Sequence, residues 1–396
     1  MDSKDFRESS PGKLVPTTHG VQAFVPEPLP RSLSISPKTV KLLAAAERAI
    51  GRLSGATLRE FNPYLISSPL LRREAILSSR MEGTLTTPEQ LVLLEAEEVD
   101  EKRRRAPDDD TEEVLNYVRA MQYGLRRLEE LPVSLRLIQE IHQVLLSGVR
   151  GEQHEPGAFR RTQNFIGTRP GDQIDEARFV PPPVPQMHEA LHDFEAYLHD
   201  DSIEDPFLVQ LALSHYQFEV IHPFRDGNGR VGRLLIPLLM VARDRLEAPL
   251  LYLSAFFERN REEYVDLLLR VSCDGSWMRW IDFFLRGVAE SAEESTGQAT
   301  ALLELRQQYH RQFQADRSSA KIIRLVDEFF QSPSITIKKA SRILDLTSQG
   351  AANNIHKLEE AGVVREVTGG KRNQVFVADE VLAFLYDQPE KRSKEA

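Results

Sequence analysis

A short stretch at residues 222–233, HPFRDGNGRVGR, brings a histidine, a carboxylate, two glycines beside an asparagine, and three arginines together ahead of an apolar run. Pro223 disfavours helical backbone in the residue before it, so an apolar helix ends here and a new helix begins near Asn228. Gly227 and Gly229 let backbone N–H groups approach a ligand without an intervening Cβ. Because a helix N-terminus also favours negative charge, this composition predicts a phosphate cradle.

The charged residues around this cradle predict transfer chemistry on a phosphate. Arg230 and Arg233 lie three residues apart, so they share one face of the first helical turn and reach different oxygens of one polyphosphate. Asp226 offers the hard oxygen ligand that Mg²⁺ prefers. Histidine titrates near neutral pH, so His222 is suited to accept a proton from an incoming hydroxyl group. A turn that only packs the fold has no need of this combination.

The pattern differs from other phosphate and metal motifs, because the chain has no GxxxxGK[ST] loop, no kinase catalytic-loop order and no HExxH helix. It resembles the signature of the Fic family, His-x-Phe-x-(Asp/Glu)-Gly-Asn-Gly-Arg-x-x-Arg. Other stretches that look like multidomain bacterial members, such as PGAFRRTQNFIG and FVPPP, extend the resemblance over residues 22–380. Every fixed position of the signature is present, as His222, Phe224, Asp226, Gly227, Asn228, Gly229, Arg230 and Arg233.

The resemblance implies a protein adenylyltransferase, which moves AMP from ATP to a hydroxyl side chain of a target protein and of the enzyme itself. His222 is then the general base, and Asp226 holds Mg²⁺ bridging the α- and β-phosphates. Arg230 supports the β-phosphate side, and Arg233 contacts the γ-phosphate. The anion hole is formed by Gly227, Asn228 and Gly229.

A second motif, SSRMEGT, begins at Ser78. Its Ser78, Glu82 and Gly83 resemble the inhibitory-helix motif of Fic proteins that carry their inhibitor in the same chain. The resemblance implies that Glu82 pairs with Arg233 and that Ser78 supports this contact. ATP then binds in a non-productive pose, because the guanidinium that orients the γ-phosphate is occupied.

Helical spacing of apolar residues dominates the chain, so we expect a mainly α fold: a Fic-type helical core with a β-hairpin flap, plus a C-terminal winged-helix domain. Thr87, Pro88 and Gln90 predict a capping box at the start of one helix. The charged run at 100–113 predicts a connecting loop. We divide the chain into an N-terminal arm and helical region with the inhibitory helix at 1–110, a Fic core at 111–292, a helical linker at 293–320 and a winged helix at 321–390.

Segments rich in proline and glycine interrupt the helices. Prolines in residues 1–35 favour an extended, polyproline-like arm. The segment 152–185 contains two β-prone stretches, NFIG and ARFVP, and predicts a hairpin flap. A target protein with a Ser, Thr or Tyr hydroxyl would dock on this flap at 162–180 by main-chain pairing. The alternative is a hairpin that only packs on the core.

Two single residues outside the motif have competing interpretations. Tyr264 is a candidate for the adenosine pocket, since related proteins often show a Tyr-Tyr pair here, but this chain has Tyr264 followed by Val265. A core tyrosine is the alternative. Cys273 we interpret as an inert thiol near the core.

The C-terminal pattern of three helices and a β-ribbon leaves its partner open. Residues 337–372 contain seven Lys/Arg and four Asp/Glu, a net charge of 7 − 4 = +3. This charge permits DNA contact. A protein-docking role, or support of a homodimer, is the alternative.

Length and composition limit the remaining possibilities. At 396 residues the chain suits two or three domains. A single cysteine allows no intramolecular disulfide and favours a reducing compartment, by default the cytoplasm. Apolar runs are too short to span a bilayer, so we expect no membrane partner, and we expect no signal peptide. The net charge of −10 argues against a chain that coats nucleic acid.

Two classes of function therefore remain. The first is a self-inhibited protein adenylyltransferase with ATP as substrate and Mg²⁺ as cofactor. The second is a winged-helix DNA-binding regulator whose Fic domain only senses a nucleotide. An intact His222 favours the enzyme, because a sensor does not need a base. Within the enzyme class, transfer of UMP, GMP or phosphocholine stays open.

Overall fold

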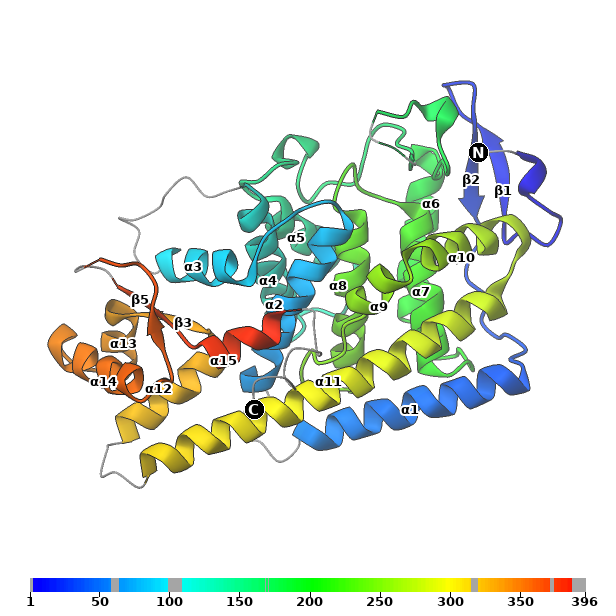
Figure 1. Cartoon of the computed structure of the whole chain (residues 1–396). Coiled ribbons are helices and arrows are strands. Elements are labelled where there is room, and N and C mark those ends of the chain that lie inside the picture. The colour runs from blue at the N-terminus through cyan, green and yellow to red at the C-terminus, as the bar shows by residue number, and fades with distance from the viewer. Residues whose placement is uncertain are drawn as a thin grey trace. The chain divides into compact units, whose positions relative to one another are not determined.

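A computed structural model describes residues 3–57, 64–98, 109–167, 169, 171–314, 320–370 and 374–386 (Figure 1). The chain forms two compact units, each assembled from segments distant in sequence. The first unit contains Met1–Ile50, Arg119–Arg245 and Phe256–Ser291. The second contains Gly51–Val118, Leu246–Ala255 and Ala292–Ala396. The helical composition agrees with the predicted fold class, whereas the predicted domain boundaries stay a prediction.

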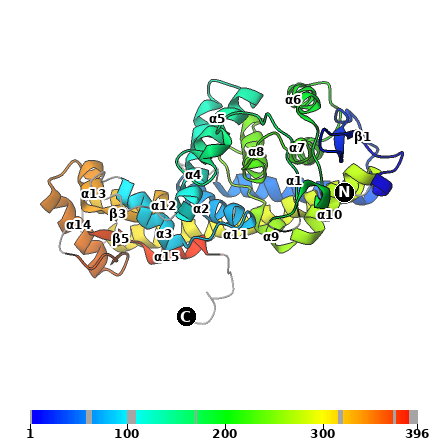
Figure 2. The same ribbon diagram turned by 90° about the horizontal axis from the view of Figure 1, so that it is seen from above.

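The centre of the first unit is a pair of helices, α7 (Phe207–Ile221) and α8 (Asn228–Ala242), joined by the motif loop. They lie side by side in both views (Figures 1 and 2). Helix α7 is buried around nearly its whole circumference, in keeping with apolar residues on every side of the helix. The surrounding helices are α5 (Leu135–Leu146), α6 (Val184–Leu198), α9 (Ser254–Arg259) and α10 (Arg261–Asp274), with parts of α1 (Pro37–Thr57), α4 (Asp109–Arg127) and α11 (Trp277–Gln314).

An aromatic cluster supports α7 and α8 from within the first unit. At its centre His215 of α7 stacks on Phe257 at 5.5 Å and on Trp280 at 6.1 Å. The His215 Nδ1 lies 3.3 Å from the carbonyl oxygen of Gly232 in α8. Burial lowers the pKa of His215 to about 3, so the ring is neutral at physiological pH. A neutral ring can donate one hydrogen bond and accept another without carrying a charge into the apolar core.

The N-terminal segment is folded, so the prediction of a polyproline-like arm over residues 1–35 is wrong where β1 (Gly12–Pro16) and β2 (Gln22–Pro26) form an antiparallel hairpin. The prolines sit at the strand ends, where their missing N–H groups remove little from the ladder. Phe24 of β2 donates its N–H to the carbonyl of Val180 at 2.9 Å. The hairpin therefore packs on the segment that was predicted to form the flap.

The second unit combines α2 (Tyr64–Met81) and α3 (Pro88–Glu98) with the C-terminal elements. The predicted capping box at the start of α3 is confirmed: Gln90 N–H donates to Thr87 Oγ1 at 3.2 Å, and Thr87 N–H donates to Gln90 Oε1 at 2.9 Å. The C-terminal elements are α12 (Ala320–Gln331), β3 (Ser334–Thr336), α13 (Ile337–Leu344), α14 (Ser348–Glu360), β4 (Arg365–Glu366), β5 (Val375–Val377), α15 (Asp379–Leu382) and the 3₁₀ turn η5 (Ala383–Leu385).

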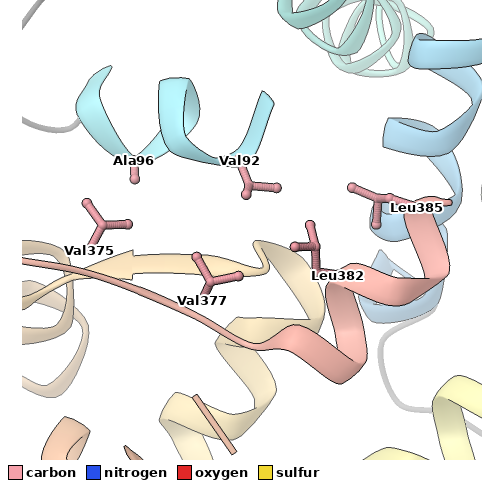
Figure 3. Packing of buried hydrophobic residues seen from close by; sticks show 6 residues of the cluster. All are labelled: Val92, Ala96, Val375, Val377, Leu382 and Leu385. Atoms are coloured by element: carbon pink, nitrogen blue, oxygen red, sulfur yellow. The ribbon is translucent and has the colours of Figure 1, made fainter. Parts of the chain in front are cut away.

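These C-terminal helices and strands follow one another in the predicted order, and their sheet has the strand order β3-β5-β4. Their assignment as a winged helix stays a prediction. One face of the sheet is covered by α3: Figure 3 shows Val92 and Ala96 facing Val375 and Val377. All four side chains are buried, together with Leu382 and Leu385.

Helix α11 runs without interruption from Trp277 to Gln314. The predicted helical linker at 293–320 is helical up to Gln314, where it forms the second half of α11. No proline occurs in this stretch, and its two glycines do not end the helix. Of the charged run at 100–113, residues 100–108 lie outside the described residues, and α4 begins at Asp109. None of the described helices is long and apolar enough to cross a bilayer.

Substitution of the two α11 glycines by alanine should have opposite effects. A Cβ on Gly287 would lie 2.6 Å from the Phe256 ring, whereas a Cβ on Gly297 would meet no heavy atom within 4 Å. We expect Gly287→Ala to destabilise the protein by about 1–3 kcal/mol through overpacking. Gly297→Ala should stabilise it by about 0.5–1 kcal/mol, because glycine has low helix propensity. Denaturant unfolding of both variants checks this; equal effects would contradict the packing role of Gly287.

Candidate functional site

The motif loop reverses the chain between α7 and α8 through two residues in the left-handed conformation. His222 caps α7 with φ 50° and ψ 60°, and Gly227 caps the start of α8 with φ 77° and ψ 4°. The first N–H groups of an α-helix point out of its N-terminus, and in α8 they belong to Asn228, Gly229 and Arg230. The structure therefore places the predicted cradle residues at a helix N-terminus, where partial positive charge accumulates.

The imidazole of His222 is oriented by the helix that it ends. Its Nδ1 lies 3.2 Å from the carbonyl oxygen of Glu219. A carbonyl can only accept, so in the neutral ring Nδ1 carries the proton and Nε2 carries the lone pair. Nε2 is therefore the basic nitrogen, as a general base requires.

The side-chain amide of Asn228 is hydrogen-bonded within the motif loop. Its Oδ1 accepts the Phe224 N–H at 2.8 Å, and its Nδ2 donates to the Phe224 carbonyl at 2.8 Å. Asn228 is 2% exposed. The amide thus fixes the backbone of the loop, and the part of Asn228 in an anion hole stays a prediction.

The charged residues of the motif lie around the same helix start. Asp226 Oδ1 accepts the Gly227 N–H at 2.6 Å and lies 3.4 Å from Nη2 of Arg230. Arg230 and Arg233 are both buried, and each residue is 3% exposed. Buried guanidinium groups one helical turn apart would interact strongly with a polyphosphate, because little water screens them.

The Asp226 carboxylate fits a magnesium ion that is also bound by phosphate. Its side chain is 41% exposed, so it remains open to solvent. A Cβ added at Gly151 would lie 2.9 Å from Asp226 Oδ2, so a glycine is needed for the chain to pass beside the carboxylate. Among the described residues no group of three or more His, Cys, Asp or Glu side chains gathers to hold a metal. One carboxylate completed by phosphate oxygens and water is the usual Mg²⁺ arrangement.

Three residues that we did not predict bind backbone groups of the motif loop: His142, Arg160 and Asn164. His142 of α5 accepts the Gly157 N–H on Nδ1 at 2.9 Å, so its Nε2–H donates to the Asp226 carbonyl at 3.0 Å. Its ring stacks on Phe224 with centroids 3.7 Å apart. Burial lowers the pKa of His142 to about 4, which keeps the ring neutral.

Arg160 and Asn164 bind the other carbonyls of the loop. Arg160 Nε donates to the His222 carbonyl at 3.0 Å, and its backbone N–H donates to the Pro223 carbonyl at 2.9 Å. Asn164 Nδ2 donates to the Phe224 carbonyl at 3.0 Å. The carbonyl oxygens of His222, Pro223, Phe224 and Asp226 thereby accept hydrogen bonds, which fix the backbone of the loop.

The predicted flap is only weakly β-structured. Within the described part of 152–185, Ile166 and Phe179 form a single antiparallel bridge, with Ile166 N–H donating to Phe179 O at 2.8 Å. Gln163 Nε2 also reaches the Pro181 carbonyl at 2.8 Å. Phe165 is 36% exposed beside this bridge. The two β-prone stretches are thus paired as predicted, but over fewer residues.

Tyr264 lies among core aromatic rings. It is 5% exposed, stacks on Phe257 at 4.4 Å, and its hydroxyl lies 2.9 Å from His215 Nε2. This is the geometry of the core tyrosine that we considered as the alternative, and its contact with adenosine stays a prediction. Cys273 is also buried, and burial raises the pKa of its thiol to about 11. The thiol is therefore protonated at neutral pH, as expected of an inert cysteine.

The residues of the proposed inhibitory motif lie at the end of α2 in the second unit. Ser78 is fully buried, and Glu82 is exposed directly after the helix. The Thr84 N–H donates to the Ser79 carbonyl at 3.1 Å and the Gly83 N–H to the Arg80 carbonyl at 3.0 Å, which is a Schellman ending. Gly83 takes φ 90°. The pairing of Glu82 with Arg233 stays a prediction.

Comparison with known proteins identifies two matching domains. Residues 40–126 match the Fic/DOC family N-terminal domain, and residues 132–240 match the Fic/DOC family domain. The chain is 33% identical over 135 residues to "Protein adenylyltransferase Fic" of Drosophila grimshawi, covering 34% of this chain and 26% of that protein. It is 28% identical over 220 residues to "Protein adenylyltransferase fic-1" of Caenorhabditis elegans, covering 53% and 41% of the two chains. The matches thus span less than half the length of these relatives.

The fold is also similar to a solved structure. A Fic family protein from Desulfovibrio desulfuricans superposes with a TM-score of 0.55 at 20% sequence identity, covering 87% of this chain and 97% of that one. The matched family domain at 132–240 contains the whole motif loop and the three residues that bind its backbone carbonyls. The chain therefore carries the N-terminal and motif-bearing domains of the Fic/DOC family.

Proposed function

We propose that the protein is an adenylyltransferase that transfers AMP from ATP to a hydroxyl side chain of a target protein and of itself. The observation that carries the proposal is the placement of a basic histidine nitrogen, His222 Nε2, in the loop that leads into an anion-binding helix N-terminus. The names of the relatives in fly and nematode support this activity. A base and an anion-binding helix start together suit nucleotidyl transfer, whereas a nucleotide sensor needs only the second.

In the proposed reaction the hydroxyl oxygen of the target attacks the α-phosphorus of ATP. The new O–P bond forms as the bond from the α-phosphorus to the bridging oxygen of the β-phosphate breaks, and pyrophosphate leaves with that oxygen. The hydroxyl proton passes to His222 Nε2. The backbone N–H groups at the start of α8 stabilise charge on the α-phosphate oxygens, and Arg230 and Arg233 stabilise the leaving pyrophosphate.

Mg²⁺ would be held by Asp226 together with phosphate oxygens. When bound, it neutralises charge on the phosphates. Asp226 itself is held in place by the Gly227 N–H and by Arg230, so its carboxylate is oriented before any ligand arrives.

The flap supplies the proposed docking edge for the target. Main-chain pairing with an exposed strand edge positions a hydroxyl with little demand on the target's sequence. Phe24 of β2 already binds the Val180 carbonyl, so the edge around Val180 is covered. The opposite segment near Phe165 is the better candidate for a target strand, because it ends at Asn164, which contacts the His222 carbonyl at 3.4 Å.

Substitution of His222 tests the activity. We expect His222→Ala in a Glu82→Gly background to lower AMP transfer by about 10²–10⁴-fold, because a general base is lost, while ATP affinity changes little. The measurement is intact mass after incubation with labelled ATP, UTP, GTP or CTP and Mg²⁺, with and without cell lysate. Calorimetry with ATP is the control for binding. Undiminished transfer in the variant would refute the mechanism, and no transfer from any nucleotide by the parent would favour a sensor.

We further propose that Glu82 inhibits the enzyme by pairing with Arg233, with Ser78 supporting the helix end. The Schellman ending of α2 supports this role, because it presents Glu82 in a defined position instead of on a frayed terminus. Its carboxylate would compete with the γ-phosphate for a guanidinium group.

Removal of the Glu82 carboxylate should therefore activate the protein. We expect both Glu82→Gly and the isosteric Glu82→Gln to raise automodification by about 5–150-fold, the range of a typical coupling between two sites. Gln keeps the side-chain shape, so it separates the effect of charge from that of backbone freedom. Rates equal to wild type in both variants would contradict the inhibitory role.

Other properties of the protein stay predictions. DNA contact through 337–372, a homodimer and a cytoplasmic location are consistent with the sequence. The first turns of α14 expose uncharged polar residues such as Gln349 and Asn353, which would suit base contacts, while Glu359 and Glu360 lie at its other end.

A further inference from the structure

We infer that Arg160 is a positioning residue for the proposed transfer reaction, because it holds the general base and both ends of the flap in one arrangement. This inference rests on the proposed function. Arg160 is 1% exposed, and its guanidinium donates to the carbonyls of His222 at 3.0 Å, Thr162 at 3.2 Å and Pro182 at 2.5 Å. Thr162 and Pro182 flank the flap segment, and His222 carries the base.

The planar fork of arginine suits this task. Its donors point in fixed and different directions, so one side chain satisfies carbonyl groups from three separate parts of the chain. A lysine at the same place would donate from a single nitrogen and could not reproduce all three contacts. An apolar residue would leave buried carbonyl groups without these donors.

The contact with His222 bears directly on the base. His222 has a left-handed backbone, which is unfavourable for a residue with a side chain unless its surroundings fix it. Its carbonyl accepts from both Arg160 and Asn164, at 3.0 Å and 3.4 Å. These bonds fix the peptide plane after His222 and thereby the direction of its imidazole. The same guanidinium binds the carbonyls of Thr162 and Pro182 at the two ends of the flap. A target docked on the flap would therefore be positioned relative to the His222 base.

The neighbouring residue offers a matched control, because Arg161 is exposed. In the Glu82→Gly background we expect Arg160→Met to lower kcat for AMP transfer by about a hundredfold, the typical effect of a misplacement of about 1 Å. Arg160→Lys should recover part of this loss, and Arg161→Met should leave kcat unchanged. ATP affinity, measured by calorimetry, should stay within about twofold in all three variants, since the anion-binding helix start is not altered.

Two outcomes would overturn the inference: an unchanged kcat in Arg160→Met, or a loss of ATP affinity as large as the loss of kcat. A second readout does not need turnover. Nitrogen NMR of the His222 ring should show the Nδ1–H form in the parent and in Arg161→Met, and a mixture of tautomers in Arg160→Met. The NMR result tests the positioning contact even if the parent transfers no AMP, which would instead contradict the proposed function.

A different observation, in the second unit, carries a second proposal. We propose that the C-terminal elements hold the Glu82 turn in its inhibitory position through α3, so that loosening α3 activates the enzyme. This rests on the proposed inhibition by Glu82. Val92 and Ala96 of α3 pack on β5 (Figure 3), and Ser334 Oγ donates to the Val92 carbonyl at 2.6 Å. Helix α3 is thus bound to the C-terminal sheet by apolar and polar contacts.

A buried ion pair connects α3 to the helix that ends at Glu82. Arg72 Nε of α2 donates to both carboxylate oxygens of Glu95 in α3, at 3.0 Å and 2.9 Å, with the side chains 7% and 11% exposed. Helix α2 also packs on α12 and η5. Arg72 also donates to the Ser68 carbonyl at 3.0 Å, but Glu95 supplies its opposite charge, so a displaced α3 would leave a buried guanidinium without its carboxylate. The position of α2 therefore depends on that of α3.

A charge exchange tests this connection. In the wild-type background we expect Arg72→Glu and Glu95→Arg each to raise automodification by at least about fivefold. The double exchange should return the rate toward wild type, because it restores the pair. Arg52→Glu is the matched control, since Arg52 and Glu293 form a pair at 2.7 Å with side chains 53% and 61% exposed. It should leave the rate unchanged.

Val92→Asp tests the link between α3 and the C-terminal sheet. It should raise the automodification rate to a similar extent. Combined with Glu82→Gly, it should raise the rate no further than Glu82→Gly alone. Unchanged rates in the single variants, while Glu82→Gly is activated, would refute the proposal, as would a double exchange as active as its parents. If Glu82→Gly is not activated, the inhibition itself fails. Hydrogen exchange at 82–86 then still tests the connection: it should speed up in Arg72→Glu and not in Arg52→Glu.

Discussion

The chemistry at this site depends on how the backbone between α7 and α8 is held. The left-handed residues His222 and Gly227 reverse the chain, and loop carbonyls such as those of His222 and Asp226 accept hydrogen bonds from buried side chains. A carbonyl oxygen near an anion would oppose its binding. Because His142, Arg160 and Asn164 bind these oxygens, the loop backbone is fixed beside the start of α8, where the N–H groups of a helix N-terminus favour an anion. The same bonds fix the direction of the His222 ring.

Two of the residues that bind the loop, His142 and Arg160, are themselves buried, and burial of polar groups is unfavourable. Desolvation lowers the pKa of Arg160 to about 10 and that of His142 to about 4, so the arginine remains charged and the histidine neutral at physiological pH. Apolar residues of the same size would be cheaper to bury. They could not bind carbonyl groups, however, so the polar layer gives the loop one defined geometry. A site that stabilises charge in a transition state needs such preorganisation.

The second unit uses buried polar contacts for a related purpose. Three successive charged residues of α2 lie inside: Arg72 binds Glu95, Arg73 binds Glu294 at 2.6 Å, and Glu74 accepts from Ser254 Oγ at 2.5 Å. An apolar interface would allow α2 to slide or rotate with modest loss. Ion pairs and hydrogen bonds to several different elements favour one arrangement of α2, which is in keeping with the proposed inhibitory role of Glu82 at its end.

The sequence by itself determined the elements and the chemical groups of the site. Helical periodicity, the Thr87 capping box and the glycines of the motif act within a few residues of each other, so their effects can be predicted locally. The motif residues can be identified because base, carboxylate and cations stand next to one another in the chain.

Tertiary structure alone decided how they are held. Arg160, Asn164 and His142 act on backbone carbonyls, and every residue has a carbonyl, so no side-chain pattern marks these partners. The N-terminal hairpin likewise forms because another segment, at Val180, offers it a carbonyl and an apolar face. Contacts of this kind join residues far apart in sequence, and only the folded chain brings them within hydrogen-bonding distance.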